Sequence, residues 1–481
     1  MEQTRLIQYL KILSAKEMDL LAAFVESAYH NRNNRCIQLL QVLQPHYPRF
    51  EGAGVAKEKV YARVFGKEHS YNDQVMRNLC SRLTDLIHRF LAIENLFRQS
   101  VLPDVYLLGE LNQRSAYHLF EYELKPARQN LEKMPVKNED YLRSRFGLEL
   151  EAFMYYNRRH PDDVPAMIKQ KNLNAGIEAL GEYYLYYLLN HYLFYLNARN
   201  IYQQPFEQET QWRHTIEALW QTLPNVSVPV KAYYLLVEML ATGTEKYYLQ
   251  LKQLLRDFAP QLPDNDVRNC YINLENYCMK ATRDGKENYL TELLDIYQTE
   301  MQLNTHLNPG ESTVSVMWLV NAVLIALRTG NIAWAETTLQ QCHEILPQQV
   351  QTDVYHFCMA NICFYKQQYN QAMQFLAVAH PNYYYSTIDI KCLLLRIFYE
   401  KGEFSLLYAQ IDTFKHYLTN NEDSFPPQRI ANTGNFVKFT ARLAKLKEYH
   451  LTDAEIANEI ATCPQITFRD WLLAKAKEIT D

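Results

Sequence analysis

The sequence predicts an all-α protein, and three observations lead to this prediction. Apolar residues recur at intervals of three and four through most of the 481 residues, which is the spacing of one helix face. Only 13 residues are glycine, although glycine ordinarily makes up about 7% of a protein, so φ > 0 turns of the kind that β-rich folds use are scarce. No run of alternating β-branched residues indicates a strand. The core must therefore form by packing helix on helix.

The first hundred residues predict a four-helix bundle. Ser14 and Glu17 have the spacing of a capping box, in which each side chain satisfies a backbone N–H of the other residue at the start of a helix. Four apolar stripes follow at 20–25, 36–43, 60–65 and 76–90, and Pro45 ends the second. We expect a domain boundary near residue 100, which gives an N-terminal domain over 1–100 and a helical-repeat domain over 101–481.

The charge is small overall but unevenly distributed. The chain has 49 basic and 54 acidic residues, a net charge of −5, which excludes a globally basic nucleic-acid-binding protein. Residues 1–100 hold 14 Lys/Arg and 10 Asp/Glu, a net of +4, which leaves 35 and 44, a net of −9, for the rest. The basic N-terminal domain keeps a nucleic-acid role open for that part of the chain.

An internal repeat lies in residues 316–420. Each unit has an apolar helix, a tight turn, an aromatic or aliphatic residue two positions after the turn, and a small or apolar residue three positions further on. The turn positions are Gly330, Gln367 and Gly402, which lie 37 and 35 residues apart. A regular period of this length is typical of proteins built from stacked helical hairpins.

The pattern resembles that of the tetratricopeptide-repeat (TPR) family, whose period is 34 residues. The first unit matches the family at the turn, at the start of the second helix, at the small packing position, in the second helix and at the closing proline: Gly330, Ile332, Ala335, Leu339 and Pro347. The second unit matches through Tyr369, Ala372, Leu376 and Ala379, whereas the third has Leu407 where a small residue is expected. The resemblance implies a TPR-like α-solenoid of antiparallel helix pairs, with capping helices in 453–481.

The resemblance also implies that the first helix of each unit lines a concave groove. The polar and aromatic residues on these helices would then bind a protein or peptide partner. They are Arg328, Asn361, Tyr365, Asp389, Arg396, Tyr399 and Glu400. Phe357 and Cys392 stand where the family's carboxylate clamp would have polar groups, so recognition of an acidic C-terminal tail is not implied. The resulting hypothesis is a non-enzymatic adaptor or scaffold.

The basic N-terminal domain supports an alternative hypothesis, a transcriptional regulator whose N-terminal domain binds DNA and whose TPR-like domain senses a partner. Residues 60–65 and 77–86 are similar in rhythm to the helix pair of winged-helix domains, which precede helical repeats in some transcriptional regulators. Arg77, Arg82 and Arg89 would then contact DNA. The fourth helix continues to about Phe97 with no hairpin after it, which is a departure from that family. A more remote alternative is a helical ribonuclease that uses Arg82 and His88.

The sequence indicates no catalytic residue, metal or cofactor. It has no HExxH, P-loop, GxGxxG or GxSxG motif. The nine cysteines include no CxxC pair, which favours free thiols in a reducing compartment over a disulfide framework. No signal peptide and no apolar stretch of about 20 residues is present. We therefore expect a cytoplasmic protein that does not interact with membranes, whose partner the sequence does not identify.

Overall fold

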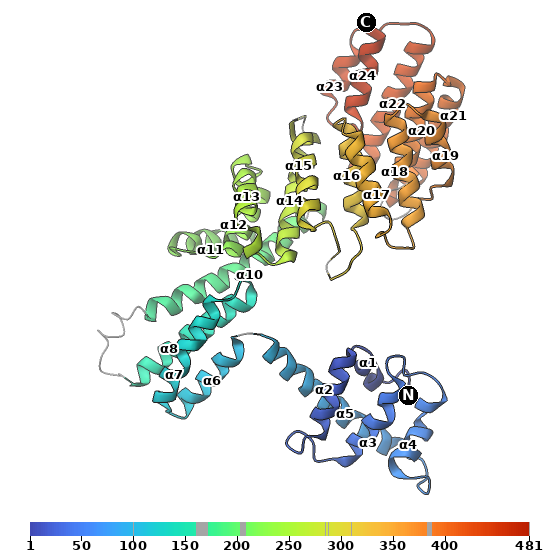
Figure 1. Cartoon of the computed structure of the whole chain (residues 1–481). Coiled ribbons are helices and arrows are strands. Elements are labelled where there is room, and N and C mark those ends of the chain that lie inside the picture. Colours follow the sequence, from blue (N-terminus) through green and yellow to red (C-terminus); the bar gives the residue numbers. More distant parts are fainter. Residues whose placement is uncertain are drawn as a thin grey trace. The chain divides into compact units, whose positions relative to one another are not determined.

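The computed structural model is all-α, which confirms the predicted fold class (Figure 1). It describes residues 1–99, 101–159, 172–202, 208–283, 285–286, 288–308, 310–381 and 387–480. These residues form 23 α-helices and four short 3₁₀ segments, and within them the only β-type pairing is an isolated bridge between Leu307 and Val314. None of the described helices is long and apolar enough to cross a membrane.

The chain divides into two compact units, and the division does not fall at residue 100, where we expected it. The first unit comprises 1–187 and 213–226, and the second comprises 188–212 and 227–481. Two of the three limits lie within helices, α10 (Asn172–Tyr202) and α11 (Glu209–Thr222), and the third lies between α11 and the next helix. The first unit therefore holds the N-terminal bundle together with α6 (Leu102–Gln113), α7 (Tyr117–Glu132) and α8 (Glu139–Arg159).

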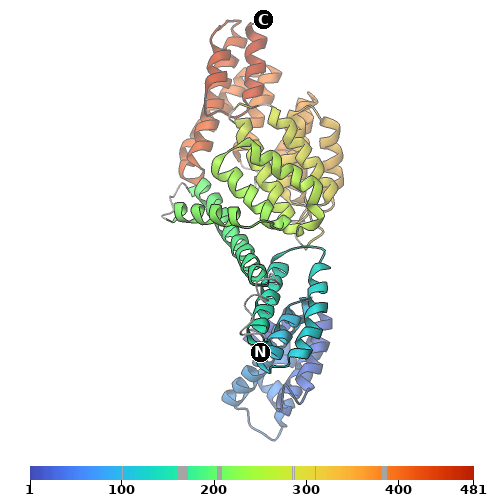
Figure 2. The ribbon, with the colours of Figure 1, turned by 90° about the vertical axis from the view of Figure 1, so that its left-hand side faces the viewer.

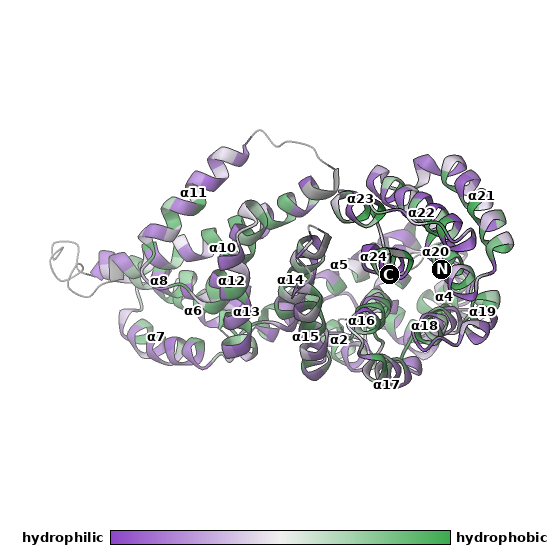
Figure 3. Cartoon of the chain, turned by 90° about the horizontal axis from the view of Figure 1, so that it is seen from above, coloured by the Kyte–Doolittle hydropathy of each residue, from purple (hydrophilic) through white to green (hydrophobic). Residues whose placement is uncertain are grey.

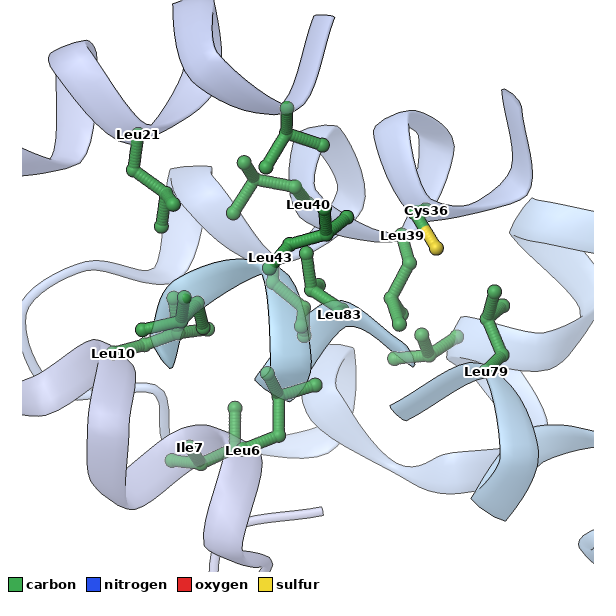
Figure 4. Close-up of a cluster of buried hydrophobic side chains, with 14 of the residues drawn as sticks. Leu6, Ile7, Leu10, Leu21, Cys36, Leu39, Leu40, Leu43, Leu79 and Leu83 are labelled. Carbon is green, nitrogen blue, oxygen red and sulfur yellow. The ribbon is translucent and has the colours of Figure 1, made fainter. Parts of the chain in front are cut away.

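The N-terminal bundle has five α-helices, where the sequence predicted four. They are α1 (Arg5–Lys11), α2 (Ala15–Glu26), α3 (Asn34–Leu43), α4 (Lys57–Phe65) and α5 (Asp73–Arg98). The additional helix, α1, is seven residues long, and the side chain of its N-cap residue Thr4 makes no capping hydrogen bond. It is held by burial of Leu6, Ile7 and Leu10 in the bundle core (Figure 4). The predicted capping box at Ser14 and Glu17 is present.

The second unit is a succession of helix pairs. The paired helices are α12 (Val228–Thr242) with α13 (Glu245–Phe258), α14 (Asp264–Arg283) with α15 (Asn288–Leu303), α16 (Val316–Arg328) with α17 (Ile332–His343), α18 (Gln351–Tyr365) with α19 (Tyr369–Val378), and α20 (Thr387–Lys401) with α21 (Phe404–Asn420). The first helices of the later pairs, α16, α18 and α20, pack in sequence order, and α22 (Pro427–Glu448) follows α20. Figure 1 labels these helices, and Figure 2 shows the green-to-red part of the chain from another side.

Two short helices complete the second unit, α23 (Ile456–Thr462) and α24 (Arg469–Thr480), within the segment where we expected capping helices. Both pack into a core shared with α20, α21 and α22. Polar and apolar residues alternate around the helices (Figure 3). Because a helix pair buries only part of its apolar surface, each pair requires a neighbour, and the last pair obtains one from these helices.

The three turns of the predicted repeat share one backbone geometry. Gly330, Gln367 and Gly402 have φ angles of 77°, 61° and 71°. In each turn the next residue donates its N–H to the carbonyl five positions earlier, at 2.7 Å, 2.8 Å and 3.0 Å respectively. This is the Schellman arrangement, which satisfies the last carbonyl groups of a helix and reverses the chain.

Hydrogen bonds from tyrosine to carboxylate tie several helices to the next pair and account for part of the high tyrosine content. The hydroxyl of Tyr233 on α12 donates to Asp266 on α14 at 2.8 Å, and that of Tyr408 on α21 donates to Glu448 on α22 at 2.8 Å. Tyr289 on α15 reaches back to Glu245 on α13 at 2.6 Å. Tyrosine suits this role because its ring packs in the core while its hydroxyl reaches a polar partner.

The shared turn geometry predicts opposite effects of two substitutions. Replacing Gly330 by Ala should destabilise the protein by about 1 kcal/mol, because a Cβ is strained at positive φ. The cost comes from the backbone alone, since nothing lies within 4 Å of the added Cβ. Replacing Gln367 by Gly should stabilise it by a similar amount. Urea unfolding of both variants measures the change in the free energy of unfolding. A change of the same sign in both would contradict the shared left-handed turn geometry.

Candidate functional site

A small pocket in the second unit brings together four of the seven residues that we expected to contact a partner. Its volume is about 170 Å³. Arg328, Asn361, Tyr365 and Arg396 line it, on the first helices of the three repeat units. The other lining residues are Met279, Asn321, Leu324, Ile325 and Phe468. Three successive repeat units therefore present polar side chains to the same space.

Helical spacing explains why these side chains meet. Asn361 and Tyr365 are four residues apart on α18, so they lie one above the other on one face. Asn321, Leu324 and Arg328 are related in the same way on α16. Because α18 packs between α16 and α20, the face that carries Asn361 and Tyr365 lies between the other two contributions.

Arg396 is the unusual member of this set because its charge is buried. Its relative exposure is 3%, and its guanidinium lies 4.6 Å from the ring centre of Phe364 and 4.1 Å from that of Phe468. Among the described residues it has no ion-pair partner, and its Nε has no hydrogen-bond acceptor. Burial lowers the pKa of Arg396, and interaction with Tyr365 partly opposes that shift.

The remaining polar groups of the pocket have partners of their own. Arg328 forms an ion pair with Asp470 on α24, and the side-chain amide of Asn361 donates to the carbonyl of Phe357 at 2.9 Å. The positive charge of Arg328 is thus balanced within the protein, whereas that of Arg396 is not. An arginine that is held between two aromatic rings and lacks an acid can receive an anionic group from outside.

The other three predicted residues hold the C-terminal part of the second unit together. Asp389 forms an ion pair with Arg429 on α22, at 2.8 Å. Glu400 accepts a hydrogen bond from the indole N–H of Trp471 at 2.8 Å and pairs with Lys475 at 2.9 Å. The ring of Tyr399 packs edge-on against that of Trp471, with centres 5.2 Å apart.

The expectation of an open groove along the first helices requires correction at three positions. Asn361, Arg396 and Tyr399 are 2%, 3% and 0% exposed, because neighbouring units and the segment around Phe468 and Trp471 cover them. Sequence reasoning did not place Phe468, Asp470, Asn321 or Met279 at this site. Only Asn321 could have been placed from its helical spacing relative to the repeat. Met279 and Phe468 reach the pocket through long-range packing, and Asp470 pairs with Arg328.

The three arginines of the DNA-binding hypothesis do not act on one surface. Arg82 and Arg89 line a hollow of about 640 Å³ at the start of α3, together with Arg32 and Arg35. Arg77 lines a different hollow and pairs with Asp73 at 2.6 Å. His88 also belongs to that second hollow, so the structure does not bring it together with Arg82, as the ribonuclease hypothesis requires.

Within the described ranges no three His, Cys, Asp or Glu side chains gather in a way that could hold a metal ion. All nine cysteines are described and free, which confirms the expectation of unpaired thiols, and seven of them are buried.

The comparisons with known proteins provide no relative for this chain. No family model, no curated protein and no solved structure matches it.

A buried pair of acids lies in the second unit, apart from the pocket. Glu275 on α14 and Glu300 on α15 are 7% and 1% exposed and are hydrogen-bonded to each other. Trp318 donates its indole N–H to Glu300 at 2.9 Å. Burial raises the pKa of both carboxyl groups, and the negative charge of Glu275 raises the pKa of Glu300 further. The folded protein therefore retains a proton that the unfolded chain loses.

This pair predicts a pH-dependent effect of Glu300→Gln. The retained proton stabilises the folded protein at low pH. This stabilisation is lost progressively as the pH rises above 4.5, the ordinary pKa of glutamate. The amide keeps an acceptor for Trp318 and cannot ionise, so the variant should be more stable than wild type at pH 8, by on the order of 1–2 kcal/mol. The difference should shrink as the pH falls to about 5.

Urea unfolding of both proteins across this range measures the effect. Burial lowers the pKa of the neighbouring His306, but this residue is present in both proteins, so its contribution cancels in the difference. A variant that is less stable than wild type by the same amount at every pH would contradict the account.

Proposed function

We propose that this protein is a non-enzymatic adaptor that binds a protein or peptide partner through its TPR-like helix pairs. The observation that carries the proposal is the pocket around Arg396, to which three successive repeat units contribute. A surface assembled from several repeats is how helical-repeat proteins recognise extended partners. The chemistry of the lining, with two asparagines, a tyrosine and two arginines, suits hydrogen bonding and charge pairing and offers no nucleophile with an adjacent base.

The charge balance of the pocket suggests which part of the partner it receives. Arg396 has no acid of its own among the described residues, so a partner carboxylate would supply the missing negative charge. A volume of about 170 Å³ is below the ~300 Å³ at which pockets for drug-sized ligands begin. We therefore propose that one acidic side chain of the partner enters the pocket, with Met279, Leu324 and Ile325 contacting its apolar stem.

A cytoplasmic location belongs to the same proposal. The nine free cysteines suit a reducing compartment. The net charge of −5 gives no reason to expect an anionic membrane surface as the partner of the whole chain.

The proposal predicts that capture of a partner depends on the pocket. Quantitative affinity capture from a lysate of the source cells should recover the partner with wild type and lose most of it with Arg396→Met. The apolar replacement removes a buried unpaired charge, which proteins tolerate when the shape is kept. Arg328→Ser should weaken capture less, because the charge of Arg328 is already balanced by Asp470.

Arg256→Ser is the matched control, since Arg256 is an arginine of the same unit that pairs with Asp295 at 3.3 Å and lies away from the pocket. Succinate should compete with the partner more strongly than chloride at equal ionic strength. Capture that is unchanged in Arg396→Met, in a variant whose thermal midpoint matches that of wild type, would refute the role of the pocket.

A further inference from the structure

A second feature, in the N-terminal bundle, is independent of the partner-binding proposal. The hollow beside the start of α3 has a volume of about 640 Å³, and four arginines line it: Arg32, Arg35, Arg82 and Arg89. We propose that this hollow binds phosphate groups, as carried by a nucleic-acid backbone or a nucleotide.

Two local features of the sequence bring these arginines together. Arg82 and Arg89 are seven residues apart on α5, which is two helical turns, so both lie on the same face. Arg32 lies in the turn before α3, and Arg35 is the second residue of that helix. Arg77, five residues before Arg82, falls on a different face and lines another hollow.

The turn that carries Arg32 is held in place by hydrogen bonds. The amide of Asn31 donates to the carbonyl of Val25 at 2.8 Å, and the side-chain oxygen of Asn31 accepts from the backbone N–H of Asn33 at 2.8 Å. Asn33 in turn caps α3 by accepting from the N–H of Arg35 at 3.0 Å. A fixed turn needs no ordering when a ligand binds, and this lowers the entropic cost of binding.

The charge in the hollow is not balanced by the protein. Asp85 is the one carboxylate among its lining residues, so four arginines and one acid give a net charge of +3. In the described part of the chain, Arg32, Arg82 and Arg89 form no ion pair, whereas two other arginines of α5 do: Arg77 with Asp73 at 2.6 Å and Arg98 with Glu17 at 3.0 Å. Three arginines without an ion pair among the described residues thus line one hollow, where they can act on one ligand.

The arrangement fits phosphate better than it fits a single carboxylate. Guanidinium groups bind phosphate oxygens through two parallel hydrogen bonds, and several of them can share the charge of a phosphate or of consecutive phosphates. The volume falls within the ~300–1,000 Å³ typical of ligand pockets, which is enough for a nucleotide. Arg35 already stacks on Phe65, 5.0 Å from the ring centre, and donates to Gln38, so we expect Arg32, Arg82 and Arg89 to make the principal contacts.

The test uses the full chain and two double variants of the same helix. Fluorescence anisotropy with labelled single-stranded and duplex oligonucleotides measures binding by wild type, by Arg82→Ser/Arg89→Ser, and by the control Arg77→Ser/Arg98→Ser. We expect the first variant to bind at least tenfold more weakly and to show a shallower salt dependence, because fewer counterions are released. The control should remain within about threefold of wild type.

Competition identifies the source of the phosphate. If ATP displaces the oligonucleotide at concentrations where inorganic phosphate does not, the ligand is a nucleotide. If neither displaces it, the ligand is the nucleic-acid backbone. Both results support a phosphate site.

Three results would overturn the inference: no binding of any oligonucleotide, ATP or phosphate by wild type; equal losses in the two double variants; or binding only to vesicles that contain phosphatidylserine. Arg82→Lys/Arg89→Lys, which keeps the charge and loses the paired hydrogen bonds, should bind with intermediate affinity and serves if the serine variant does not fold. Capture through the Arg396 pocket should be unaffected by these variants, so this proposal and the partner-binding proposal can fail separately.

Discussion

A helix pair can bury only part of its apolar surface, and the organisation of the second unit follows from this constraint. Each pair between α12 and α21 uses the next pair to complete its core, and the last one uses α22, α23 and α24. Stacking in this way places the same face of α16, α18 and α20 side by side. The pocket is therefore a by-product of the repeat, and its chemistry depends on which side chains occupy that face.

The local features of this architecture were predictable from the sequence. The all-α class, the capping box at Ser14 and the three turn positions of the repeat each depend on residues close together in the chain, and the structure has all of them. Gln367 is informative because it takes the same left-handed conformation as the two glycines. The repeat period identified this turn although its residue type did not.

Features that depend on tertiary packing were not predictable in the same way. The helix α1 is only seven residues long and makes no side-chain cap, and it is held because the bundle buries its apolar side. The sequence placed Arg396 and Tyr399 on an open groove, whereas contacts with Phe468 and Trp471, about 70 residues further along the chain, cover them. No local pattern indicates that the C-terminal helices pack against α20. Because this packing was not predictable, only four of the seven expected residues line the pocket. The other three contact the C-terminal helices instead.

Two arginine environments distinguish the two units and their proposed roles. In the second unit a single buried guanidinium lies between two aromatic rings, in a space that admits one small group. In the N-terminal bundle several exposed guanidinium groups share a larger hollow. Buried single charges confer selectivity for one partner group, while exposed clusters give strong, salt-dependent attraction for polyanions. The two proposals therefore concern partners of different chemistry.

We propose that Arg396 is a charged group that lacks an anion until a partner provides one. A crystal structure of the full chain soaked with succinate tests it most directly. The account predicts a carboxylate within hydrogen-bonding distance of the Arg396 guanidinium, with the aromatic rings of Phe364 and Phe468 still on either side. A pocket that contains only water at saturating succinate, or an acid of the protein itself paired with Arg396, would contradict it.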